Sequence, residues 1–221
     1  IKNGHDNQEQ FNNSINTANS SSNKLLNTVK NIVLTLGGVT AMKSLVNLSD
    51  TVTNNKARLS LVVDDGGSVE ELENKIFASA DRARADYLNM TSSVSKLNLN
   101  AGSAFKSNDE TIAFAELLNK QFAISGAKQQ EISSATLQLT QALGSGVLRG
   151  EELNAVFEAS PNIIQTIADY LEVDIGKIRN MASEGLITAN VIKNAMFDSA
   201  DQINERFNKM PMTWSQIWTK A

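Results

Sequence analysis

Apolar positions near the start of the chain recur at alternating steps of four and three residues. This spacing is typical of the a and d positions of a coiled coil, and it is sustained over about four heptads. The positions are Phe11, Ile15, Ala18, Ser22, Leu25, Val29, Ile32 and Leu36. Ser22 is a weak member, and the nine asparagines of the first 31 residues lower helix propensity. We therefore predict a helical arm whose seam needs a partner, either another copy or the rest of the domain.

Residues 32–48 are largely apolar, which raises the question of a membrane span. A span needs about 20 clean apolar residues. This stretch is shorter and is interrupted by Lys43 and by the pair Gly37 and Gly38. We expect a buried or interfacial helix with a flexible point at the glycines, and no stable membrane span.

From residue 49 onward, the sequence alternates between stretches whose apolar residues recur at helical spacing and residues that typically cap helices. Ser68 begins a capping box, and its helix is expected to present one apolar face. That face consists of Val69, Leu72, Ile76, Ala80, Ala83 and Tyr87. A polar connection is predicted over 98–108. Asn108 is expected to cap a helix that stops near Gly126.

Capping residues also mark the ends of the helices predicted after Gly126. The next helix is expected to end at residues 144–146, and another runs over about 151–159. Ser160 and Pro161 predict a cap followed by an N1 proline. Asp174 is expected to cap a short helix closed by Gly185, and Thr188 a long one that lasts until Pro211.

Together these patterns predict an all-α protein. The chain has only two prolines and 5% aromatic residues, and no stretch alternates apolar and polar residues long enough for a strand. We expect a multi-helix globular domain over 49–221, preceded by a long coiled-coil-like helical arm with an apolar end over 1–48. The missing initiator Met and the uncapped ending also suggest a piece of a longer protein, without a visible signal peptide.

The residue types leave little room for catalysis. The chain has no cysteine and one histidine, His5, in a polar terminal segment, which excludes thiolate metal sites and His-based triads. Asp64 and Asp65 are interpreted as a turn, because they lack the further oxygen ligands of a calcium loop. Two groups of acids could suggest an acid/base pair or a metal site: Glu151 with Glu152, and Asp169 with Glu172 and Asp174. Glu151 and Glu152 are instead interpreted as opening a helix, and Asp174 as a helix cap. No enzyme activity, catalytic residue, metal or cofactor is predicted.

Two stretches of the chain have the outline of a binding motif. The glycine-rich stretch 144–150 lacks the Gly-Lys-Ser/Thr ending of a phosphate loop and follows no strand, so an interhelical turn is favoured. Residues 178–196 have the outline of a helix-turn-helix, which would make the chain a DNA-binding regulator. Between Gly146 and Gly185, however, the sequence has three cationic and seven anionic side chains. A surface that binds phosphates should be basic. Helix packing is the preferred interpretation, with no specific nucleic acid as partner.

Residues 141–154, Gln-Ala-Leu-Gly-Ser-Gly-Val-Leu-Arg-Gly-Glu-Glu-Leu-Asn, resemble the signature of the N-terminal domain of phage tail tape measure proteins. The resemblance covers about residues 45–221 and is specific over 141–213. One departure is Glu172, where the family usually has glycine. The residues that match the signature are Gly146, Val147, Leu148, Arg149, Gly150, Glu152, Leu153, Asn154, Pro161, Gly185, Pro211 and Thr213.

This resemblance implies a structural component of a phage tail. Tape measure proteins are long helical molecules around which the tail tube polymerises, and their length sets the tail length. The implied partners are the tail tube protein, tail assembly chaperones and tail-tip proteins, with self-association through helices. The implied location is the lumen of the virion tail, after assembly in the cytoplasm of the bacterial host, and the gene is expected to lie in a prophage.

Overall fold

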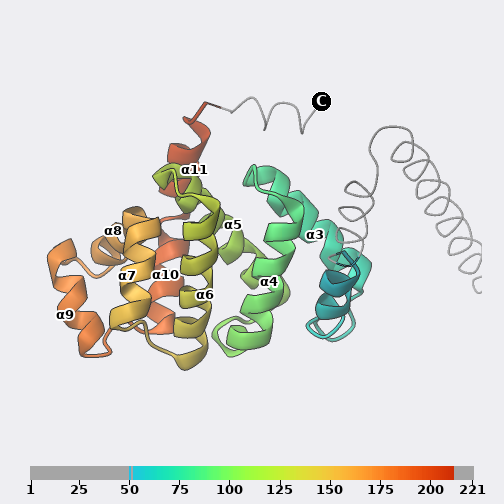
Figure 1. Ribbon diagram of the computed structural model, residues 1–221, viewed down its shortest axis with the longest axis horizontal. Helices are drawn as coiled ribbons and strands as arrows, with labels where there is room; N and C mark the ends of the chain where they lie inside the picture. Colours follow the sequence, from blue (N-terminus) through green and yellow to red (C-terminus); the bar gives the residue numbers. More distant parts are fainter. Residues whose placement is uncertain (1–49, 51, 212–221) are drawn as a thin grey trace, which may run out of the picture. The chain divides into compact units, whose positions relative to one another are not determined.

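The computed structural model describes residue 50 and residues 52–211 (Figure 1). The chain divides into two compact units, Ile1–Thr53 and Asn54–Ala221, and nearly all described residues belong to the second. The predicted boundary between residues 48 and 49 remains a prediction. Several predicted sites lie outside the described residues: the seam positions Phe11, Ile15, Leu25, Val29, Ile32 and Leu36, and Thr213 of the signature.

The prediction of an all-α fold is confirmed, because the described part of the chain contains helices and no named strand. Residues 52–59 are helical. The labelled elements are α3 (Val69–Arg82), α4 (Tyr87–Ala101), η1 (Gly102–Ala104), α5 (Asn108–Ser125), α6 (Gln129–Ser145), α7 (Gly150–Ala159), α8 (Pro161–Tyr170), η2 (Ile175–Lys177), α9 (Ile178–Ser183), α10 (Ala189–Asp198) and α11 (Ala200–Asn208). In this region, no helix is both long and apolar enough to cross a membrane.

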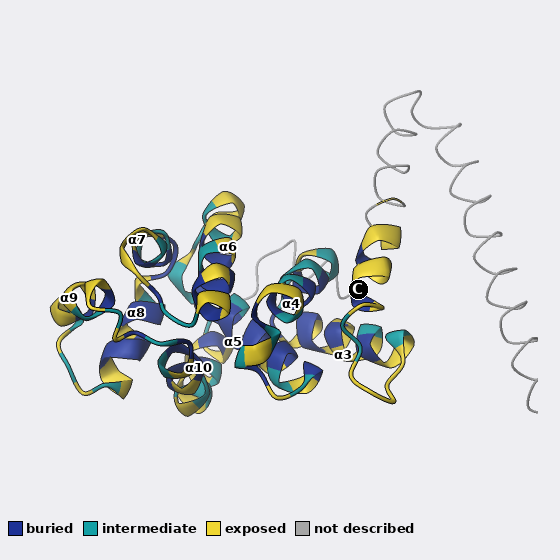
Figure 2. Ribbon diagram, turned by 90° about the horizontal axis from the view of Figure 1, so that it is seen from below, coloured by how far each residue is buried: buried dark blue, intermediate teal, exposed yellow. Residues whose placement is uncertain are grey.

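Helix α5 lies at the centre of the second unit. It contacts α3, α4, α8, α10 and α11, and Figure 2 shows it among its neighbours with most of its surface buried. Phe114, Leu118 and Phe122 of α5 are almost fully buried. Because α5 is covered on several sides, polar residues on it that face other helices must find partners inside the protein.

Several predicted caps are confirmed. The Ser68 hydroxyl accepts a hydrogen bond from the Glu71 amide, and the Thr188 hydroxyl accepts one from the Val191 amide. Pro161 is the first residue of α8. Gly126 and Gly185 adopt left-handed backbone conformations, with φ of 68° and 72°, where helices α5 and α9 end.

Two helices predicted as continuous are each broken in two. The helix from Ser68 ends at Arg82, so Tyr87 is the first residue of α4 and does not belong to the face of α3. The break is a Schellman turn in which Arg84 has φ of 51° and the Ala85 amide donates to the Ala80 carbonyl. The sequence did not indicate this break, because the left-handed position of such a turn usually carries glycine and here carries arginine.

The long helix predicted from Thr188 is likewise wrong. It ends at Asp198, and α11 begins at Ala200, because Ser199 has φ of −88° and ψ of 8° and interrupts the helix. The two halves nevertheless bury the predicted residues Ile192, Met196, Ile203 and Phe207. The apolar positions keep a helical spacing across the break, so the sequence pattern does not indicate it.

Three smaller predictions also need correction. Helix α4 continues to Ala101, so the connection predicted over 98–108 is shorter than expected. Ser107 rather than Asn108 is the N-cap of α5, since its hydroxyl accepts from the Glu110 amide. Ser160 and Asp174 occupy N-cap positions without side-chain capping bonds.

Candidate functional site

The glycine-rich stretch of the predicted signature connects α6 to α7. Gly146 ends α6 in a left-handed conformation with φ of 90°. At the start of α7, the Arg149 amide donates to the Glu152 carboxylate at 3.0 Å. A carboxylate of the protein itself accepts a hydrogen bond from one amide of this helix terminus, and the arrangement is that of the interhelical turn predicted from sequence.

The connection between α6 and α7 is hydrogen-bonded to the segment that precedes α10. The Leu148 amide donates to the Ile187 carbonyl, and the Ala189 amide donates to the Gly146 carbonyl, both at 2.8 Å. Val147 and Thr188 thereby form an isolated antiparallel bridge. Leu148 and Ile187 are fully buried. We call residues 146–149 and 187–189 the signature junction, because it joins the α6–α7 corner to the start of α10.

The structure brings only part of the predicted signature together at this junction. Gly146, Val147, Leu148 and Arg149 belong to it, and the Arg149 guanidinium lies 3.7 Å from the position that a Cβ on Gly185 would occupy. The other described members lie elsewhere. Leu153 is buried in α7, Pro161 begins α8, and Pro211 follows α11 near the end of the described range. The sequence did not predict the junction itself, because segments of four and three residues are too short to show a strand pattern.

The predicted acidic positions lie in turns and at helix ends. Asp64 accepts a hydrogen bond from the Asn108 amide at 2.8 Å, which ties the 64–67 turn to the start of α5. Glu151 and Glu152 lie in the first turn of α7. Within the described residues, no group of three or more acidic or histidine side chains could hold a metal ion.

Two cations of the helix-turn-helix outline, Lys193 and Arg179, contact other groups of the domain itself, Lys193 in the interior and Arg179 at the surface. Lys193 is 8% exposed, and its ammonium donates to the Ala104 carbonyl at 2.8 Å and pairs with Glu110 at 3.3 Å. Arg179 donates to Asn154 at 2.8 Å and lies 5.0 Å from the centre of the Phe157 ring. The helix-turn-helix interpretation is therefore disfavoured, since Lys193 faces the core rather than a groove of DNA.

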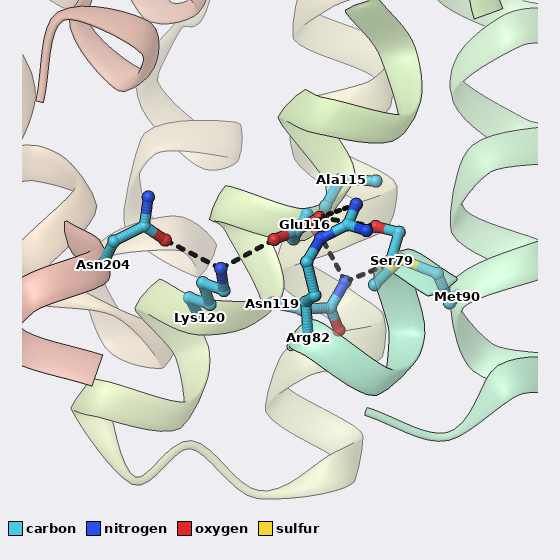
Figure 3. A network of polar contacts seen from close by, with 8 residues as sticks. All are labelled: Ser79, Arg82, Met90, Ala115, Glu116, Asn119, Lys120 and Asn204. Carbon is cyan, nitrogen blue, oxygen red and sulfur yellow. Dashed lines mark hydrogen bonds and ion pairs between the residues drawn. The ribbon is translucent and has the colours of Figure 1, made fainter. Parts of the chain in front are cut away.

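A polar network with a buried centre at Glu116 and Lys120 joins α5 to α3 and α11 (Figure 3). The Glu116 carboxylate accepts hydrogen bonds from Lys120 at 2.7 Å, from Arg82 at 2.7 Å and from Ser79 at 3.0 Å. Lys120 also donates to the side chain of Asn204 at 2.7 Å. The network therefore connects helices that are distant in the sequence, and its two innermost charges neutralise each other.

Electrostatics within this network favour the charged form of Glu116. Burial by itself would raise the pKa of the Glu116 carboxyl, but hydrogen bonds from Arg82 and Lys120 outweigh burial and lower that pKa below its ordinary value. The Glu116 hydrogen bond conversely raises the pKa of Arg82. A carboxyl with a lowered pKa between two cations cannot serve as a general acid near neutral pH, so the arrangement is that of a structural ion cluster.

Comparison with known proteins identifies the class to which these features belong. A family model described as "Tape measure protein" matches residues 43–221, which is well over half of the chain and includes every described helix. Searches among curated proteins and among solved structures found no match.

Proposed function

Because this chain belongs to the tape measure protein family, whose members are structural components of phage tails, we propose that it scaffolds the tail tube and helps to set tail length. The observation that carries this proposal is the family match over residues 43–221. The proposed partners are the tail tube protein, the tail assembly chaperones and the tail-tip proteins. The protein would act through contacts between helices and not as an enzyme.

The geometry of the second unit supports a structural role. Several of the described signature residues lie at helix ends, at the buried position Leu153 or in the signature junction, where they stabilise one arrangement of helices. Charged groups in the interior are paired with one another, as in the Glu116 network. The proposed location is the lumen of the phage tail, reached after assembly in the cytoplasm of a host that carries the gene in a prophage.

Tail length provides the direct test. Inserting about ten helical heptads before residue 49 in the phage gene would lengthen the helical ruler by roughly 105 Å, at about 1.5 Å per residue. Electron microscopy of the resulting virions should show tails longer by that amount. A phage carrying Glu172→Gly, which changes no length, serves as the control. Unchanged tails in the insertion phage would contradict the proposed role in setting length.

We also propose that the seam from Phe11 to Leu36 mediates self-association. Leu25→Glu combined with Val29→Glu should abolish the oligomer in analytical ultracentrifugation, because two seam positions would then carry charge. Asn27→Glu combined with Asn31→Glu adds the same charge at the same spacing away from the seam. If the oligomer persists in the Leu25→Glu and Val29→Glu variant, the seam is not the interface. The same conclusion follows if the Asn27→Glu and Asn31→Glu variant loses the oligomer to the same extent.

A further inference from the structure

Helix α11 packs mainly against α5 and buries few of its own side chains. Only Ile203 and Phe207 of its residues are buried, and its principal neighbour is α5 (Figure 1). Ser199 interrupts the helical backbone between α10 and α11. A short helix with two buried side chains and a break at its start has the features of an element that opens independently of the core.

Two cations from other elements hold the end of α11. The Arg84 guanidinium lies 4.6 Å from the centre of the Phe207 ring, and the Lys120 ammonium lies 5.6 Å from it. Arg84 also donates a hydrogen bond to the Met210 carbonyl at 3.0 Å, just beyond the helix. Lys120 donates to the Asn204 side chain. Cation–π contacts and hydrogen bonds from charged groups therefore add to the apolar contact of α11.

The backbone of Arg84 has a conformation that is unusual for a residue with a side chain. Arg84 and Glu172 are the two described non-glycine residues with positive φ, at 51° and 56°. Each occupies the left-handed position of a Schellman turn, in which the next amide donates back to the helix: Ala85 to Ala80, and Val173 to Ala168. Glycine would adopt this conformation more readily at both positions. Only Arg84 uses its side chain to reach another helix, and that helix is α11.

We propose that α11 is a detachable helix, which leaves its place on α5 as a unit while α3 to α10 remain folded, and that Arg84 controls how often it opens. The α3–α4 turn thereby sets the docking of a helix more than a hundred residues away in the sequence. This inference is independent of the role in setting tail length.

Hydrogen exchange on the full chain, followed by mass spectrometry, tests the proposal. In the wild type, amides of α11 should exchange faster than those of α5 and α8, through openings that do not require global unfolding. Arg84→Gly should accelerate exchange in α11 by about tenfold, because it removes a cation–π contact and a charged hydrogen bond. Exchange in α5 and α8 should not rise. Glu172→Gly is the matched control, since it also introduces glycine into a left-handed turn, and it should leave α11 unchanged.

The possible outcomes separate the proposal from a merely structural role. If α11 exchanges only at the rate of α5 in the wild type, it does not detach and the proposal is overturned. If Glu172→Gly accelerates α11 as much as Arg84→Gly, Arg84 does not control the opening. Phe207→Leu removes the ring that both cations face but keeps an apolar side chain. It should accelerate exchange in α11 alone, including where Arg84→Gly proves too unstable to study.

Discussion

Gly144 of α6 faces the backbone carbonyl of Asn100 in α4, so closely that a Cβ at position 144 would overlap the carbonyl oxygen. The absence of a side chain is what allows the two helices to approach here. Because the obstacle is backbone rather than a flexible side chain, Gly144→Ala must push α4 and α6 apart. We expect a loss of about 1–3 kcal/mol in the free energy of unfolding, measured by urea denaturation.

Gly150 supplies the control for this substitution. It also lies in a helix, but a Cβ there would meet no atom within 4 Å. Gly150→Ala should therefore leave stability unchanged or raise it by up to about 1 kcal/mol, through the higher helix propensity of alanine. Equal losses at both positions would show that close approach to Asn100 is not the cause.

Glu172→Gly should stabilise the protein. Glu172 has φ of 56° at the end of α8, where its Cβ is strained, and no hydrogen bond of its side chain explains its presence. Relief of this strain, partly offset by the greater freedom of glycine in the unfolded chain, should add about 0.5–1 kcal/mol in urea denaturation. Glu172→Ala removes the same carboxylate but keeps a Cβ. If alanine stabilised as much as glycine, repulsion from nearby acids rather than backbone strain would be the reason.

Features determined by neighbours in the sequence could be predicted, as Ser68, Thr188 and Gly185 show. Each acts on a helix end within a few residues, so its residue type carries the signal. The helix end at Arg84 could not be predicted in this way, because a left-handed conformation is expected at glycine and not at arginine. Glu172 departs from the glycine that is usual in the family, which counted against a turn at this position, and the structure nevertheless has the turn, with a φ of 56° at Glu172.

The role of Lys193 could not be predicted for a different reason. Its partner, the carbonyl of Ala104, lies 89 positions away in the sequence, and a lysine on a helix is ordinarily exposed. The same holds for Glu116, whose cluster combines residues from α3, α5 and α11. Periodicity indicates which face of a helix is buried, but it does not show which buried charges will meet.

The Glu116 network should make stability depend on pH. The pKa of Glu116 is lower in the folded protein than its ordinary value of 4.5. The carboxyl therefore contributes stability above that value, and this contribution is lost as the pH falls through the folded pKa. Glu116→Gln should cost about 2–3 kcal/mol at pH 7, because it leaves the buried Lys120 without a counter-charge. The difference between variant and wild type should shrink on acidification.

Glu205 provides the comparison for this pH dependence. A hydrogen bond from Lys209 also lowers the pKa of Glu205, but this pair lies at the surface and solvent screens it. Glu205→Gln should thus have little effect on urea midpoints between pH 7 and pH 3. A Glu116→Gln variant whose deficit stays constant over this range would rule out ionisation of Glu116 as the source of its effect.

Lys193 distinguishes a structural role from DNA binding. Lys193→Met keeps most of the side-chain volume but removes the ammonium that binds the Ala104 carbonyl and Glu110. We expect a loss of about 1–3 kcal/mol in the free energy of unfolding, because Glu110 and the carbonyl lose a buried partner. Fluorescence anisotropy with duplex DNA should show no salt-dependent binding by either protein. Lys177→Gln, at an exposed position, should alter neither measurement. Binding by the wild type that both variants lose would instead establish the helix-turn-helix, since only a surface that contacts phosphates requires both cations.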